Sequence, residues 1–201
     1  TTTLVSVSSA EVPGTSDSYA PSITSDGRYI VFESDASNLV APDTNSGRDV
    51  YVRDRWAATT ELISRSTDGD LADGTSHQPS ISDDGRYVLF RSAATNWGGP
   101  ATGSRWNLWV RDRATGTTTR ASIGHAGDAI GADAEFGVIS GSGRYVAYSS
   151  AASNIVSGDT NGTKDVFVRD LVNKTNERVS ISVFEGQSLM VQVIKEPIGT
   201  K

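Results

Sequence analysis

The chain has 201 residues, a formal net charge of −6 at pH 7 and 36% hydrophobic residues, and it contains no cysteine. The lack of cysteine excludes thiol catalysis and cysteine-ligated zinc, and the negative charge makes nucleic acid an unfavourable partner, because phosphate backbones are repelled. No apolar run approaches the roughly 18 residues of a membrane-spanning helix, so no membrane span is expected.

The first predicted element is a strand over residues 1–8, where β-branched residues alternate in part with others. Similar segments at 59–66, 117–123 and 175–182 each follow a Val-Arg-Asp unit and a short turn. Residues 1–8 are therefore predicted to form an extra outer strand that has no repeat unit of its own in front of it.

An internal repeat organises the rest of the chain. The sequence Gly-Arg-Tyr begins at residues 27, 85 and 143, and the sequence Val-Arg-Asp begins at residues 52, 110 and 168. Two independent markers that both recur every 58 residues establish a tandem repeat.

Each period contains four predicted strands and no predicted helix. A short strand leads through a tight turn, of the Asp-Gly type in the first two periods, into an apolar strand, and a loop then leads to the Val-Arg-Asp strand and the outer strand. The apolar strand, residues 29–32 in the first period, has apolar side chains in succession, which indicates burial on both faces. A four-stranded meander repeated in tandem predicts an all-β fold, a β-propeller array of three complete four-stranded blades.

The predicted boundaries follow from this period. The repeat region spans 1–183, with blades at about 19–66, 77–124 and 135–182. The tail, residues 184–201, lacks the next Pro-Ser-Ile-Ser segment and is interpreted as an added strand that caps or closes the array.

These motifs, in this order and spacing, resemble the TolB-type, WD40-like β-propeller repeats of bacteria over residues 1–183. The resemblance implies a binding or scaffold module and an extracytoplasmic location, secreted or periplasmic, although propellers host many activities. No Gly-x-Ser-x-Gly nucleophile elbow occurs, so a serine hydrolase part is not expected. Residues 186–201 resemble a strand–turn piece of the RNA-binding OB-type domain of ribonuclease E/G enzymes, and a recombinant junction is the other explanation for this tail.

Three blades are fewer than the 4–8 of natural propellers, which leaves sheet edges and apolar faces uncovered. Two chains together would make a six-bladed ring, so the expected partner is a second copy of the chain, with a dimer favoured, or another protein. The alternative is an engineered or fragmentary assembly unit.

Two loops carry acidic residues in a spacing that resembles the first half of a calcium-binding loop. The candidate Ca²⁺ ligands are Asp43, Asn45, Asp49, Asp159, Asn161 and Asp165. Ca²⁺ takes 6–8 oxygen ligands, so the alternative is an Asx turn in which these side chains bond their own backbone. The corresponding loop of the second blade has no acidic residue.

One predicted ligand pocket lies at the mouth of the central channel. Tyr19, His77 and Glu135 are repeat-equivalent and precede the first strand of each blade, where divergent side chains can form a composite pocket. Trp97 and Trp106 in the second blade form a candidate aromatic pair for carbohydrate or protein contact, with simple loop packing as the alternative.

The Arg-Asp pairs recur in every blade, which favours a structural role, since active sites are usually singular. Their aspartates are expected to accept turn N–H groups and to pair with the arginine of Gly-Arg-Tyr in the same blade. The main functional hypothesis is a non-catalytic binding or scaffold module that self-associates, and the alternative is a carbohydrate-processing or carbohydrate-binding propeller.

Overall fold

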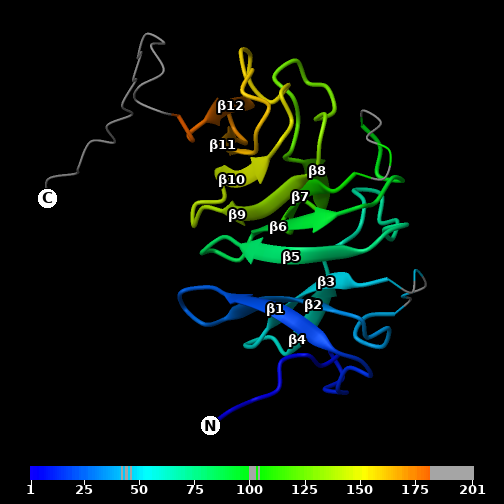
Figure 1. Ribbon diagram of the computed structural model, residues 1–201. Coiled ribbons are helices and arrows are strands. Elements are labelled where there is room, and N and C mark those ends of the chain that lie inside the picture. Colours follow the sequence, from blue (N-terminus) through cyan, green and yellow to red (C-terminus); the bar gives the residue numbers. More distant parts are fainter. Residues whose placement is uncertain (42, 44, 46, 100–102, 104, 182–201) are drawn as a thin grey trace, which may run out of the picture.

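The computed structural model describes the whole chain except residues 42, 44, 46, 100–102, 104 and 182–201. The described residues form twelve strands in three four-stranded antiparallel sheets, which follow one another from the N-terminal to the C-terminal end (Figure 1). They contain no helix of the length and hydropathy needed to cross a membrane. The predicted all-β fold with three complete blades is confirmed, whereas the tail at 184–201 lies outside the described residues.

Each sheet is one blade, and its strands pair in sequence order. Blade 1 contains β1 (Ser18–Ile23), β2 (Tyr29–Ser34), β3 (Asp49–Asp54) and β4 (Thr59–Leu62). Blade 2 contains β5 (Ser76–Ile81), β6 (Tyr87–Ser92), β7 (Asn107–Asp112) and β8 (Thr117–Arg120). Blade 3 contains β9 (Ala134–Ile139), β10 (Tyr145–Ser150), β11 (Asp165–Asp170) and β12 (Thr175–Arg178).

The first strands of the blades, β1, β5 and β9, are neighbours, because β5 contacts both of the others. Each of the three has a break in its register with the next strand, which is a β-bulge. At the break the backbone is left-handed at a residue that is not glycine, with φ of 47° at Ala20, 53° at Gln78 and 52° at Phe136. The bulge is therefore part of the repeat.

The core lies between the blades. Val31 and Val50 of blade 1 pack with Phe90 and Trp109 of blade 2, whereas Phe32 belongs to a second cluster on the other face of blade 1. Successive residues of β2 thus point into different clusters, which confirms that the apolar strand is buried on both faces. One face of blade 2 meets blade 1, and its opposite face meets blade 3.

The prediction of an outer strand over residues 1–8 was wrong. Val7 forms only an isolated bridge with Pro13, and the same bridge recurs between Arg65 and Leu71 in the segment that connects blades 1 and 2. The Val7 carbonyl accepts a hydrogen bond from the Thr60 hydroxyl of β4. Residues 7–13 therefore have the same structure as an inter-blade connection. Residues 1–6 form no strand, because the described chain offers no neighbouring strand with which they could pair.

The repeated Arg-Asp pairs have the structural roles expected from the sequence. Asp54 accepts hydrogen bonds from the backbone N–H groups of Trp56 and Ala57, and it pairs with Arg28 at 2.7 Å. The Arg28 guanidinium, together with these N–H groups, lowers the pKa of Asp54 to about 2. The two other blades repeat this ion pair at 2.7 Å each, in Arg86 with Asp112 and Arg144 with Asp170.

Candidate functional site

The three predicted pocket residues occupy equivalent places on neighbouring inner strands, and each contacts a residue of its own blade. In blade 1 the guanidinium carbon of Arg48 lies 4.3 Å from the centre of the Tyr19 ring. Arg48 also pairs with Glu33 at 3.0 Å and with Asp35 at 2.9 Å. Tyr19 therefore belongs to a charged cluster at the start of β1.

In blade 2 the equivalent pair is aromatic. The rings of His77 and Trp106 meet edge to face with centres 4.4 Å apart, and the Arg91 guanidinium lies 4.7 Å from the Trp106 ring. Burial, together with the charge of Arg91, lowers the pKa of His77. His77 is thus neutral at pH 7 and packs as an aromatic group.

In blade 3 the equivalent pair is ionic, because the Lys164 ammonium lies 2.6 Å from a Glu135 carboxylate oxygen. The three blades therefore place a cation–π pair, an aromatic pair and an ion pair at the same two repeat positions. We call these three pairs the channel-end row; they are Tyr19–Arg48, His77–Trp106 and Glu135–Lys164.

The two candidate tryptophans of blade 2 have different neighbours. Trp97 packs edge to face against Phe90 and Trp109, with ring centres 5.7 and 5.1 Å apart, and joins the cluster between blades 1 and 2. Trp106 lies instead in the channel-end row. A ligand role for either one stays a prediction.

The acidic loop of blade 1 leads into β3. Asp43 accepts a hydrogen bond from the Tyr51 hydroxyl at 3.1 Å, and the fully buried Asp49 accepts one from the Ser64 hydroxyl at 2.6 Å. Asn45 donates to the Ala72 carbonyl at 3.1 Å and accepts from the Gly47 N–H, as in an Asx turn. The second oxygen of each carboxylate, Asp43 Oδ1 and Asp49 Oδ2, is buried without a hydrogen-bond partner.

In the acidic loop of blade 3, an arginine side chain lies between the two aspartates. Arg178 of β12 places its Nη1 atom 2.9 Å from Asp159 Oδ1 and 3.6 Å from Asp165 Oδ2. Asn161 donates to Asp165 at 2.8 Å, and its own oxygen accepts the Thr163 N–H. A metal ion in this loop would have to displace the guanidinium. Within the described part of the chain, no three His, Cys, Asp or Glu side chains form a group suited to a metal.

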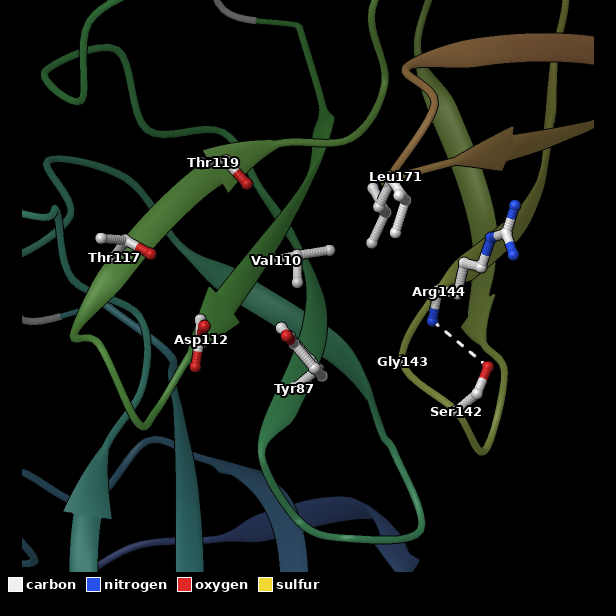
Figure 2. Close-up of a pocket in the computed structure, with 10 residues that line it drawn as sticks. Tyr87, Val110, Asp112, Thr117, Thr119, Ser142, Gly143, Arg144 and Leu171 are labelled. Carbon is white, nitrogen blue, oxygen red and sulfur yellow. Dashed lines mark hydrogen bonds between the residues drawn. The ribbon is translucent and has the colours of Figure 1, made fainter.

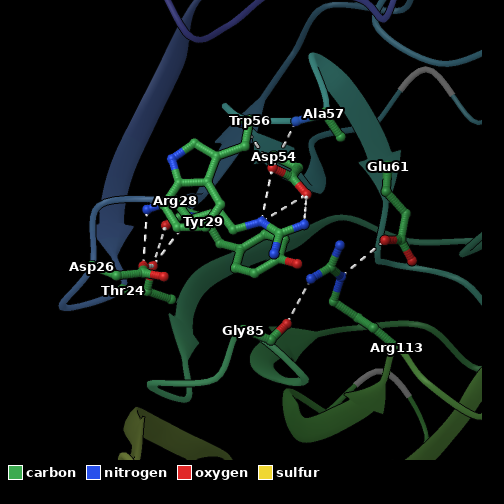
Figure 3. Close-up of polar contacts among 10 residues, drawn as sticks. All are labelled: Thr24, Asp26, Arg28, Tyr29, Asp54, Trp56, Ala57, Glu61, Gly85 and Arg113. Atoms are coloured by element: carbon green, nitrogen blue, oxygen red, sulfur yellow. Dashed lines mark hydrogen bonds and ion pairs between the residues drawn. The ribbon is translucent and has the colours of Figure 1, made fainter.

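The junction between blades 1 and 2 is closed by one arginine (Figure 3). Arg113 donates to the Gly85 carbonyl at 2.6 Å and to Glu61 at 2.9 Å, and its guanidinium lies 4.7 Å from the centre of the Tyr29 ring. The same ring packs against Gly85, where an added Cβ would lie 2.2 Å from it. Glycine is required there by this close approach.

The junction between blades 2 and 3 differs at two positions and contains a pocket (Figure 2). Leu171 stands at the repeat position of Arg113, and Thr119 stands at that of Glu61. Tyr87 packs on Gly143, as Tyr29 packs on Gly85. Leu171, Thr119, Tyr87 and Gly143 help to line a cavity of about 260 Å³. The cavity is present because a leucine is too short to fill the space that Arg113 fills one junction earlier.

Sequence reasoning missed three residues that are not part of a motif, Arg178, Arg113 and Glu61. Arg113, in the turn after β7, and Glu61 of β4 join blades 1 and 2, whereas Arg178 of β12 contacts the acidic loop of its own blade. Comparison of residues 58 positions apart would have pointed to Arg178. It aligns with Arg120 and Leu62, so the charge at this position differs between blades.

Comparisons with known proteins agree with this architecture. No family model and no curated protein matches the sequence. Among solved structures, TolB from Acinetobacter baumannii is 20% identical with a TM-score of 0.51 over 83% of this chain and 33% of its own. A putative TolB from Agrobacterium tumefaciens is 17% identical with a TM-score of 0.51 over 81% of this chain and 48% of its own.

A third similar structure is the β-propeller domain of the Trilobed protease from Pyrococcus furiosus, described as having an open velcro topology. It is 11% identical with a TM-score of 0.53 over 84% of this chain and 44% of its own. The chain therefore spans between a third and a half of the length of these structures. The likeness shows a β-propeller fold.

Proposed function

We propose that the chain is a non-catalytic binding or scaffold module that closes into a six-bladed ring by head-to-tail pairing of two copies. One observation carries this proposal. The outer face of blade 3 and the outer face of blade 1 carry the two halves of the junction that joins blades 1 and 2.

The apolar part of this match is seen in side-chain exposure. Val166 on blade 3 is 43% exposed, whereas Val50, at the same repeat position on blade 1, is 0% exposed because blade 2 covers it. On the opposite end of the array Ile23 is 58% exposed, whereas its repeat mates Ile81 and Ile139 are 8% exposed. Pairing the two end faces would bury exposed side chains whose repeat mates are already buried at the internal junctions.

The polar part of the match concerns the closing arginine. Arg55 is the repeat mate of Arg113, and it already donates to the Gly27 carbonyl at 2.8 Å, as Arg113 does to Gly85. The exposed Glu177 of blade 3 is the repeat mate of Glu61. A second copy that docks blade 1 on blade 3 would restore the Arg–Glu pair of the internal junction.

Two such contacts close a ring, because each copy offers one end face of each kind. The resulting channel mouth would display the channel-end row twice. Its varied side chains suit recognition of a protein surface, and carbohydrate is the alternative ligand class. An extracytoplasmic location belongs to the same proposal and is tested by cell fractionation.

The mass in solution tests ring closure. Light scattering should give twice the mass of one chain, and Glu177→Arg should shift the protein towards the monomer. Adding Arg55→Glu to that variant reverses the pair and should restore the dimer. A monomer for the unmodified chain, or a double variant that is no better than the single one, would refute head-to-tail closure.

Turnover tests the alternative function. A carbohydrate-processing role predicts hydrolysis or elimination of a glycan that is lost in Glu135→Gln. A binding role predicts saturable binding with no product, measured by calorimetry and product analysis on the same panel of glycans and peptides.

A further inference from the structure

The acidic loops of blades 1 and 3 have the same carboxylates but different partners. In blade 3 the oxygens Asp159 Oδ1 and Asp165 Oδ2 both face the Nη1 atom of Arg178. In blade 1 the matching oxygens, Asp43 Oδ1 and Asp49 Oδ2, are buried and have no hydrogen-bond partner. The two loops therefore differ by one positive charge.

The cause of the difference is one residue of the outermost strand. Position 62 of β4 aligns with Arg178 of β12 and is Leu62, a buried apolar side chain. Blade 2 has an arginine at this position, Arg120, but has Asn107 in place of the aspartate found at 49 and 165. Only in blade 1 do two acidic side chains stand without the arginine.

Buried carboxylates without a counter-charge are costly, and proteins normally pair them or use them to bind a metal. One oxygen of the aspartate is bonded alike in both loops, by the Ser64 hydroxyl at Asp49 and by the Ser180 hydroxyl at Asp165. The second oxygen differs, because Asp165 Oδ2 accepts from Asn161 at 2.8 Å and lies 3.6 Å from Arg178, whereas Asp49 Oδ2 is buried without a partner. The blade 1 loop thus lacks the groups that face this oxygen in blade 3.

We infer that the loop of blade 1 binds a hard divalent cation, of which Ca²⁺ is the type, through Asp43 Oδ1 and Asp49 Oδ2. The Tyr51 hydroxyl, which bonds the other oxygen of Asp43 at 3.1 Å, places a neutral oxygen beside the site. Waters complete the coordination, because oxygen ligands are what Ca²⁺ requires and two carboxylates alone do not reach 6–8. The metal takes the electrostatic place that Arg178 has in blade 3.

A site with two carboxylates and several waters is expected to be weak, with a dissociation constant on the order of 10⁻⁴ to 10⁻³ M, as in extracellular calcium modules. At 10 mM CaCl₂ the folding equilibrium constant should then rise about 10- to 100-fold relative to the same protein in EDTA. Chemical denaturation in the two solutions measures this ratio. Calorimetry with CaCl₂ should give one site per chain.

Three variants test the assignment. Asp43→Asn should remove the calcium effect, and Leu62→Arg should also remove it, since the introduced guanidinium reproduces the arrangement of blade 3. Arg178→Leu is the matched gain-of-function control, because it should create a second calcium site in the loop of Asp159 and Asp165.

Terbium supplies a readout that does not depend on stability. Tb³⁺ bound beside Tyr51 should luminesce on tyrosine excitation, and excess Ca²⁺ should quench the signal. A calcium effect that persists in Asp43→Asn would overturn the inference. So would a chain stabilised by mild acid and not by calcium, which would mean that a proton neutralises the pair. Neither result depends on ring closure, since both measurements apply equally to a monomer.

Discussion

Replacing Arg113 by alanine should destabilise the array by about 2–5 kcal/mol. Hydrogen bonds to charged groups contribute roughly 1.5–3 kcal/mol, here the bond to the Gly85 carbonyl at 2.6 Å. The ion pair to Glu61, whose side chain is 40% exposed, adds roughly 0.2–1 kcal/mol, and the contact with the Tyr29 ring adds roughly 0.5–1 kcal/mol. Urea denaturation followed by tryptophan fluorescence measures the loss.

The next junction of the same chain supplies the control. Arg113→Leu combined with Glu61→Thr copies the residues at Leu171 and Thr119, so this double variant should recover at least half of the lost stability. It keeps an apolar side chain at the junction and leaves no carboxylate without its partner. If Arg113→Ala costs less than about 0.5 kcal/mol, or if the copied junction is no better, the arginine does not hold the blades together.

Two further predictions concern the backbone and the pH. Gly143→Ala should cost more than about 2 kcal/mol, because its Cβ would lie 2.2 Å from the Tyr87 ring, whereas Gly158→Ala has no atom within 4 Å and should cost about 1 kcal/mol from its positive φ alone. Unfolding midpoints of the two variants should differ in this order, and equal midpoints would contradict the packing argument. The three paired aspartates have a pKa of about 2, below their unfolded value of about 3.9, so the stability they give is present above pH 4 and is lost as the pH falls towards 2. Urea midpoints from pH 5 to 2.5 should fall less steeply in Asp112→Asn, and parallel curves would argue against the pairing.

The repeat made the blades predictable because the signal is local and occurs three times. The turn at Gly27 and the apolar residues after it specify a hairpin and a doubly buried strand without reference to distant parts of the chain. The pairing of Arg28 with Asp54 followed from the same regularity, since both belong to motifs on adjacent strands.

Other features depend on contacts that no local pattern contains. Residues 1–8 have the composition of an outer strand, but a strand needs a neighbour, and the described chain provides none there. The bulges were not predicted, because Ala20, Gln78 and Phe136 give no glycine signal for a positive φ. The spacing of acidic residues that resembles a calcium-binding loop was visible in both loops. The ion pair that distinguishes the two loops involves Arg178, which lies on another strand.

The left-handed residue in each inner strand has a consequence for how this array diversifies. An L-residue in that conformation costs roughly 1–2 kcal/mol, yet the chain has alanine, glutamine and phenylalanine there. The bend is therefore imposed by the surrounding sheets, and the side chain at that place is free to change without altering the path of the backbone. Each blade thus has the same shape with a variable side chain next to the channel-end row, so repeated blades can acquire unlike surfaces while the geometry of the blade stays constant.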